Sequence, residues 1–271
     1  MSEVLRIVLI GSTGLVGRKL IDACIGRGNV RLIAVARREV KLPQGARMEL
    51  VVADPANWGA VIDAVRPDAL ICALGTTWKR AGKDEAAFRA VDQQLVIDTA
   101  RAAHRAQVRG MVCVSALGAD IRSKNFYLRV KGEVEKELSS IGFKRLDILR
   151  PGLLRGVRVG DHRPIEALGQ ALAPLVSPFL IGKWKPYHPV GADVVARAAL
   201  GLAVATLSPN WQWALLGFLL VGAGCSNVVP VMFSLIGKQK VMAENVAVPA
   251  ASRVSSAVLL PSNTIALAEG R

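Results

Sequence analysis

Short apolar runs alternate with longer amphipathic stretches over the first two-thirds of the chain. The apolar runs predict buried strands at Leu5–Ile10, Arg31–Ala36, Glu49–Ala53, Ala69–Leu74, Met111–Ser115 and Arg145–Leu149. Stretches of helical period predict helices at Arg18–Ile25, Glu85–Ala106 and Phe126–Ile141. Continuous apolar strands separated by helices are typical of a parallel sheet covered on both faces. The pattern therefore predicts an α/β fold with a doubly wound parallel sheet, which binds ligands at the carboxyl ends of its strands.

The pattern changes after about Leu207. The segment 211–236 contains no charged residue, and it is longer than the roughly 20 residues that a helix needs to cross a bilayer. Ser226, Asn227 and Pro230 within it weaken the interpretation as a simple spanning helix. We therefore divide the chain into an α/β domain at 1–206 and an apolar C-terminal extension at 207–271, with membrane contact through 211–236 as one interpretation.

Composition and charge narrow the classes of partner. Hydrophobic residues make up 52% of the chain and charged residues 21%, which predicts a sizeable core rather than disorder. The formal net charge is +14 and the sequence pI is about 10.2, a balance that fits nucleic acid, an anionic membrane or an anionic cofactor. The basic residues are scattered rather than massed in one block, so we expect no nucleic-acid partner.

Cysteine spacing and the start of the chain bear on metal chemistry and location. None of the four cysteines forms a CxxC pair, so we expect neither a metal site nor a redox pair. Cys72 and Cys113 lie in apolar strand-like runs, where a cysteine usually acts as a small hydrophobe. The chain enters a strand almost at once, without a basic-then-apolar signal segment, which predicts a cytoplasmic location.

A glycine-rich turn joins the first predicted strand to the first predicted helix. In GSTGLVG, Gly11 suits a tight turn, Gly14 lets the backbone approach a pyrophosphate, and Gly17 lets helix and strand pack closely. The N-terminus of the helix would then offer free N–H groups and a positive dipole end to the phosphates. The alternative is a purely structural turn. The residues expected to contact a dinucleotide here are Gly11, Ser12, Thr13, Gly14, Leu15 and Val16.

The end of the second predicted strand indicates which dinucleotide is bound. NAD enzymes usually place an acidic residue there to accept from the ribose 2′-OH, whereas this strand runs into Arg37 and Arg38. Guanidinium groups bind the oxygens of a 2′-phosphate in a forked geometry, so NADP(H) is favoured over NAD(H). The alternative is a pair of solvated surface arginines.

Two further strand ends supply candidate contacts to the same cofactor. Asp54 and Pro55 follow the third predicted strand, where Asp54 is placed to meet the adenine ring. Leu74, Gly75 and Thr76 come at the end of the fourth, where they would line the middle of the cofactor. The carboxyl ends of parallel strands meet at one edge of the sheet, which brings these segments together.

Three residues form a candidate catalytic set. Ser115 ends the fifth predicted strand, and Tyr127 and Lys131 follow four positions apart on a predicted helix, so they share one face. A nearby ammonium favours the phenolate form of a tyrosine, which makes it a better acid or base near neutral pH. Lys131 would also reach the nicotinamide ribose, and Ser115 would orient a substrate carbonyl. The alternative for a YxxxK pair is ordinary helix surface.

These motifs together resemble the short-chain dehydrogenase/reductase superfamily, and most closely its atypical branch, the Tat-interacting oxidoreductase-like proteins and their bacterial relatives. The residues that carry the resemblance are GSTGLVGRKL, CALGTTWKRAG followed by FRAVD, VSALGAD, FYLRVKGEVEKEL and LRPGLL. They follow one another in order between residue 4 and about residue 155.

The resemblance implies a Rossmann-like, NAD(P)-binding domain with Ser115, Tyr127 and Lys131 as the catalytic trio. It also implies that Pro151, Gly152 and Leu153 pass beside the nicotinamide. Superfamily members often use an asparagine in the preceding long helix for a proton relay, whereas this chain carries Asp92 in VDQQLV.

The resemblance continues through 156–205 and then fails. His188 in that stretch is expected to be a structural loop residue. The stretch 215–242 resembles a fragment of a major facilitator transporter, which suggests a fusion or frameshift. The alternative is an apolar helix that packs on the domain or mediates dimer contacts.

Two functions compete at this point. One is an NADP(H)-dependent oxidoreductase that transfers hydride to or from a carbonyl or hydroxyl group of a small molecule that the sequence does not identify. The other is a non-catalytic regulator that senses NADP(H) and binds another protein. A homodimer through the long helices is compatible with both.

Overall fold

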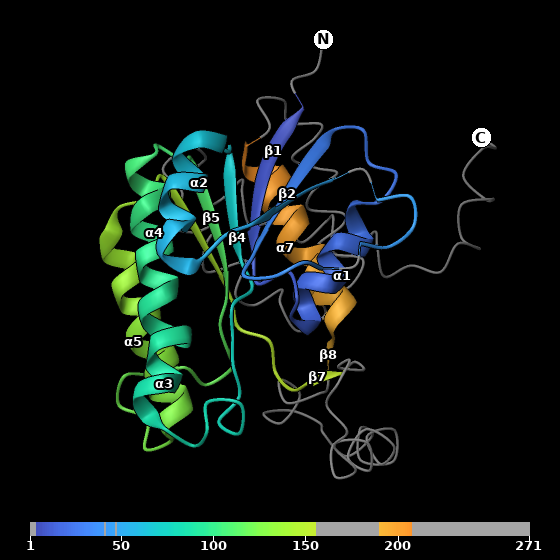
Figure 1. Ribbon diagram of the computed structural model, residues 1–271. Coiled ribbons are helices and arrows are strands. Elements are labelled where there is room, and N and C mark those ends of the chain that lie inside the picture. The colour runs from blue at the N-terminus through green and yellow to red at the C-terminus, as the bar shows by residue number, and fades with distance from the viewer. Residues whose placement is uncertain (1–3, 41, 47, 156–189, 208–271) are drawn as a thin grey trace, which may run out of the picture.

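Six parallel strands form the central sheet of the computed structural model, which describes residues 4–40, 42–46, 48–155 and 190–207 (Figure 1). Their spatial order is β3-β2-β1-β4-β5-β6. The strands are β1 (Leu5–Ile10), β2 (Val30–Ala36), β3 (Glu49–Val52), β4 (Ala69–Cys72), β5 (Gly110–Val114) and β6 (Arg145–Leu149). In register, Ile7 of β1 lies between Leu32 of β2 and Ala69 of β4. The order reverses between β1 and β4, so their carboxyl ends flank the crevice where such sheets bind ligands.

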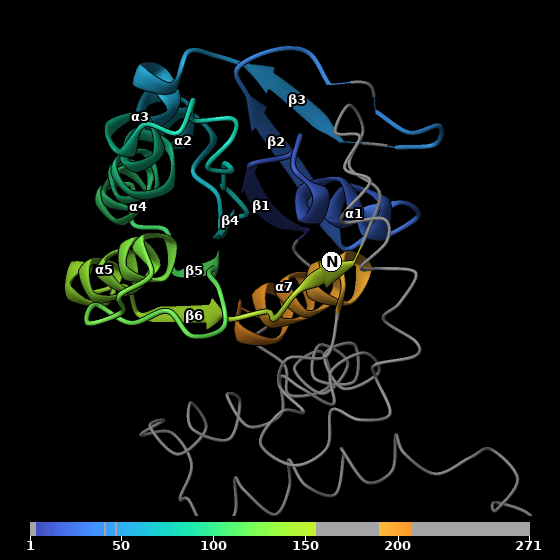
Figure 2. The same ribbon diagram turned by 90° about the horizontal axis from the view of Figure 1, so that it is seen from below.

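Helices cover both faces of this sheet (Figure 2). On one face lie α1 (Leu15–Cys24) and α7 (Ala192–Leu207). The other face carries α2 (Trp58–Val65), α4 (Leu95–Arg105) and α5 (Phe126–Ile141). Two short elements precede helices on this side, the 3₁₀ turn η1 (Pro55–Asn57) and α3 (Glu85–Arg89), and the π-helical turn η2 (Ala90–Gln94) joins α3 to α4.

The alternation of side chains along each strand fills two separate cores. In β1, Ile7 and Leu9 face α1 and α7, whereas Val8 and Ile10 face the other helical layer, and all four are fully buried. This two-sided burial is why the strands are continuous apolar runs. Helix α7 is rich in alanine, which lets it lie close against α1 and the sheet. It begins next to a small parallel pair of strands, β7 (Leu154–Arg155) and β8 (Val190–Gly191).

The predicted fold class is confirmed, and the differences lie at the ends of elements and in two helices. The first helix begins at Leu15, three residues before the predicted Arg18, because Gly14 already serves as its N-cap. The predicted helix Glu85–Ala106 is interrupted by η2. Helix α2 was not predicted; it follows η1, which Asp54 caps through a carboxylate that accepts from the N–H of Ala56 at 2.9 Å.

Several predictions concern residues outside the described part of the chain. These are the C-terminal extension beyond Leu207, the apolar segment 211–236 and the transporter-like stretch 215–242, together with His188. None of the helices in the described ranges combines the length and apolar character needed to cross a membrane.

Candidate functional site

The glycine turn after β1 brings the backbone of α1 close to the end of β4. Gly11 has a φ of +91°, and a Cβ at this position would lie 2.5 Å from the carbonyl carbon of Ala73. A Cβ on Gly17 would overlap the carbonyl oxygen of Gly11. The N–H of Gly14 donates to the Gly11 carbonyl at 3.0 Å, and no side chain caps the start of α1. The turn therefore leaves the first N–H groups of the helix free to bind an anion.

One buried hydroxyl in this turn has no partner of its own. Ser12 is 1% exposed, and its Oγ makes no hydrogen bond to the described residues. A buried hydroxyl left unpaired costs free energy, so such a group usually has a partner in a ligand or in water. Together with the space that the glycines leave, this orphaned oxygen fits a bound phosphate group.

A cavity of about 620 Å³ opens in front of the turn. Its walls come from the carboxyl ends of β1, β2 and β4, as expected for the crevice at the point where the strand order reverses. Its lining consists of 11–14, 35–38, 73–76, Trp58, Arg80, Ala81, Ala87 and Val91. The structure thus brings together the predicted residues Gly11, Ser12, Thr13, Gly14, Arg37, Arg38, Leu74, Gly75 and Thr76.

Three arginines lie in this cavity. Arg37 and Arg38 follow β2, and Arg80 reaches it from the loop between β4 and α3. None of the three forms an ion pair with a carboxylate in the described ranges. Their charge is therefore available to an anionic ligand. Arg80 was not singled out in the sequence, although it belongs to the CALGTTWKRAG motif.

Other predicted contacts do not line the cavity among the described residues. Asp54 caps η1, and Trp58 occupies the wall beside it, with its Nε1 donating to the Ala53 carbonyl at 3.1 Å. Val16 is a buried residue of α1. The residues placed outside the lining are Leu15, Val16, Asp54, Pro55, Lys131, Pro151, Gly152 and Leu153. For these positions a cofactor contact stays a prediction.

Tyr127 and Lys131 lie four residues apart on α5, as predicted. The Lys131 Nζ is 6.0 Å from the centre of the Tyr127 ring. The tyrosine is 39% exposed, whereas the lysine is buried. The buried ring of Phe88 contacts Tyr127 edge-on, with 6.0 Å between ring centres, and so supports its position. Helix α5 therefore carries a partly exposed Tyr127 phenol, packed against Phe88, next to the buried Lys131 ammonium.

Asp92 holds this ammonium from the η2 turn. Its Oδ1 lies 2.9 Å from the Lys131 Nζ, and its Oδ2 accepts a 2.6 Å hydrogen bond from the N–H of Thr76. Burial disfavours the charge on Lys131, but the Asp92 carboxylate, with a smaller contribution from Tyr127, outweighs it and raises the pKa of Lys131. The lysine is therefore kept cationic. Sequence reasoning noted Asp92 only as a departure from the family's asparagine.

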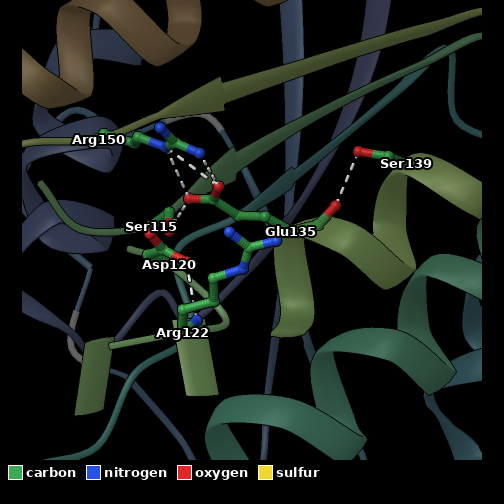
Figure 3. Close-up of polar contacts among 6 residues, drawn as sticks. All are labelled: Ser115, Asp120, Arg122, Glu135, Ser139 and Arg150. Atoms are coloured by element: carbon green, nitrogen blue, oxygen red, sulfur yellow. Dashed lines mark hydrogen bonds and ion pairs between the residues drawn. The ribbon is translucent and has the colours of Figure 1, made fainter. Parts of the chain in front are cut away.

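Ser115 lies in a second polar cluster, which it forms with Glu135 and Arg150 (Figure 3). Its hydroxyl donates to Glu135 Oε1 at 2.5 Å, and its N–H donates to the Leu149 carbonyl at 2.7 Å. The Arg150 Nε donates to both oxygens of Glu135 at 3.0 Å, and these hydrogen bonds raise the pKa of Arg150 against the effect of its partial burial. The structure thus places Tyr127 next to Lys131, whereas the Ser115 hydroxyl is hydrogen-bonded to Glu135 instead.

The segment after β6 lies beside this cluster. The Pro151 carbonyl accepts from the N–H of Leu117 at 2.9 Å, and the Leu153 carbonyl accepts from the N–H of Val190 at 2.8 Å. Leu153 itself is 64% exposed. In the described ranges no group of three or more histidine, cysteine or acidic side chains is arranged to hold a metal ion.

Comparison with known proteins identifies the cofactor class of this fold. Residues 11–166 match a family model described as NAD(P)H-binding. The mitochondrial protein fmp52 of Aspergillus niger is 35% identical over 210 residues, which are 75% of this chain and 88% of the relative. The mitochondrial protein FMP52 of Meyerozyma guilliermondii is 34% identical over 75% of this chain and 87% of the relative.

Solved structures show the same fold at low sequence identity. The enzyme WbmH of Bordetella bronchiseptica, in complex with NAD+, superposes with a TM-score of 0.55 at 15% identity, over 73% of this chain and 72% of that one. UDP-glucose 4-epimerase of Thermotoga maritima, with UDP-glucose, gives 0.56 at 14% identity over 73% of each chain. The expected Rossmann-like, NAD(P)-binding fold is confirmed.

The same comparison corrects the predicted location. The relatives are named as mitochondrial proteins, so the cytoplasmic location predicted from the sequence is wrong. That prediction was based on the lack of a secretory-type segment, and mitochondrial addresses follow a different pattern, amphipathic and rich in arginine.

Proposed function

This chain belongs to an NAD(P)H-binding family, and from that premise we propose that it is an oxidoreductase of the short-chain dehydrogenase/reductase type that uses NADP(H). The substrate is a small molecule with a carbonyl or hydroxyl group. The bound nicotinamide supplies the hydride acceptor or donor. The protein supplies binding, orientation and a proton at the Tyr127 hydroxyl.

The observation that carries the proposal is the cavity, which joins a phosphate-type turn to three arginines without carboxylate partners in the described ranges. The turn of Gly11 to Gly14 would hold the pyrophosphate, with the unpartnered Ser12 hydroxyl among its donors. Arg37 and Arg38, with Arg80, would bind the 2′-phosphate, whose oxygens match the forked guanidinium geometry. An NAD-type site would instead carry a carboxylate for the 2′-OH.

The proton chemistry follows from α5. The Tyr127 hydroxyl, at the surface, would donate a proton to the carbonyl oxygen during reduction and take it back during oxidation. The Lys131 ammonium, 6.0 Å from the ring centre, favours the phenolate that this cycle creates. It is also the group proposed to bind the nicotinamide ribose.

A panel of aliphatic, aromatic and quinone carbonyl compounds, each with NADPH, tests the proposal. We expect wild-type turnover on at least one compound, and a loss of at least about 100-fold in kcat for Tyr127→Phe. Phenylalanine keeps the ring against Phe88, so the Kd for NADPH stays the same. Equal kcat in wild type and variant would contradict the role of Tyr127.

One observation favours a second function, a regulator that binds NADP(H) without catalysis. The Ser115 hydroxyl, expected to orient the substrate carbonyl, donates to Glu135 instead. Tight NADPH binding without turnover across the whole panel, together with an NADPH-dependent protein partner, would support the regulator over the enzyme.

A further inference from the structure

Asp92 joins two parts of the candidate site that are far apart in the sequence. It is fully buried and lies in η2, a π-helical turn between α3 and α4. One carboxylate oxygen faces the Lys131 ammonium on α5, at 2.9 Å. The other accepts from the N–H of Thr76, in the loop that lines the cofactor cavity, at 2.6 Å. A π-helical turn is uncommon and is frequently found at functional sites.

The two contacts require a carboxylate rather than an amide. Both neighbours, the Thr76 N–H and the Lys131 ammonium, are donors, and a carboxylate has two acceptor oxygens. An asparagine has one acceptor oxygen and one NH₂ group, so one of the two donors would face another donor. The buried ammonium would also lose its counter-ion, which is costly in a site of low dielectric.

We propose that Asp92 is a positioning residue that ties the Lys131 ammonium to the Thr76 loop, so that the helix bearing the catalytic pair and the wall of the cofactor cavity are held as one unit. The proposal rests on the proposed function for the roles of Tyr127 and Lys131. It assigns to Asp92 a direct contact with Lys131 and with the Thr76 loop, in place of the relay that the family's asparagine implies.

Among the groups around Lys131, the Asp92 carboxylate is the one that most favours its charged form. Tyr127, on the same helix α5, lies near the Lys131 ammonium. The buried thiols of Cys72, on β4, and Cys113, after it in the sheet on β5, also lie near this ammonium. Burial alone would lower the pKa of the ammonium, and the Asp92 carboxylate is the largest effect in the opposite direction. Replacing Asp92 by asparagine therefore lowers the pKa of Lys131.

Competitive acetylation measures this change without substrate or cofactor. Traces of acetic anhydride are applied to the intact protein between pH 7 and pH 12, and the modified peptides are quantified by mass spectrometry. Lys136, exposed on the same helix, is the internal reference. The variants are Asp92→Asn and, as a matched control, Asp98→Asn, which changes an exposed aspartate on α4 that accepts from the Gln94 side chain.

In the wild type we expect Lys131 to become reactive at higher pH than Lys136. In Asp92→Asn we expect the midpoint of Lys131 reactivity to fall by at least about one pH unit, a tenfold change in its acid equilibrium, and NADPH affinity to weaken. In Asp98→Asn both stay at wild-type values. A simple opening of the site would raise the Lys131 rate at every pH without moving its midpoint.

An unchanged midpoint in Asp92→Asn, with or without a faster rate, would overturn the proposal. Should that variant fail to fold by circular dichroism, the wild type still decides, because a Lys131 midpoint at or below that of Lys136 would overturn it too. Failure of the proposed function is a separate result: it would appear as no NADPH binding or as no turnover across the carbonyl panel, whereas the acetylation midpoints require neither nucleotide nor substrate.

Discussion

At the residue scale, the site depends on glycines that let the backbone pass close to a strand and on buried or unpaired charges. It also contains the Ser115 hydroxyl, whose hydrogen-bond partner differs from the expected substrate. Gly11 and Gly17 were predictable, because a helix start this close to a neighbouring strand leaves no room for a Cβ. Asp92 and Arg80 were not predictable, since their roles depend on which loops the fold brings together. Ser115 comes directly after β5, one residue beyond the end of the strand, and its hydroxyl donates to Glu135 on α5.

The Ser115 contact leads to a prediction about stability. The hydrogen bond to the buried Glu135 carboxylate should contribute about 1.5–3 kcal/mol to folding, as bonds to charged groups do. Ser115→Ala should therefore lower the free energy of unfolding, measured by urea denaturation, by that amount and leave kcat largely intact. Ser139→Ala, which removes an exposed hydroxyl bonded to the Glu135 carbonyl on the same helix, serves as control. Unchanged stability with lost turnover would instead support the substrate-orienting role.

At the element scale, α5 is held at three levels along its length. Asp92 contacts it at Lys131, Arg89 pairs with Glu133 across 2.5 Å, and the Glu135 carboxylate joins it to β5 and to Arg150. The helix that carries Tyr127 is therefore anchored to α3, η2 and two strand ends.

The Arg89–Glu133 pair gives a pH-dependent prediction. The hydrogen bond from Arg89 lowers the pKa of Glu133 against the effect of burial. A carboxylate with a lowered folded-state pKa stabilises the protein above its unfolded pKa and loses that effect as pH falls through the folded value. Glu133→Gln should therefore cost no more than about 1 kcal/mol at pH 7, because the pair is partly exposed. Thermal unfolding midpoints of wild type and variant should converge as the pH falls through the lowered folded-state pKa of Glu133. A difference that does not shrink as the pH falls below the usual pKa of a glutamate would contradict this account.

Sequence pattern alone located most elements, and the exceptions have physical causes. Strands β1 and β6 and helix α5 match the predicted bounds, because their apolar positions follow the strand and helix periods closely. The π-helical turn could not be predicted, since its residues keep an ordinary helical composition and pattern. Helix α2 follows a proline and an aspartate cap, a signal that was assigned to cofactor binding instead.

At the scale of the whole molecule, the strand order β3-β2-β1-β4-β5-β6 creates one crevice and gathers the binding residues there. The alternation of strands and helices sufficed to predict this architecture. It could not show that a loop far along the chain adds Arg80 to the arginines after β2. The resulting cluster of positive charge, set against the glycine turn, is the basis for assigning NADP(H) rather than NAD(H).

The most direct test of that claim is a fluorescence titration of the purified protein with NADPH and with NADH. We predict a Kd for NADPH at least about tenfold lower than for NADH, equivalent to about 1.4 kcal/mol. The triple variant Arg37→Gln, Arg38→Gln, Arg80→Gln should lose this preference but still bind NADH, and Arg105→Gln, an exposed arginine on α4, should keep it. Equal affinity of the wild type for the two nucleotides would contradict the assignment of the arginines, and no binding of either would contradict the cofactor site itself.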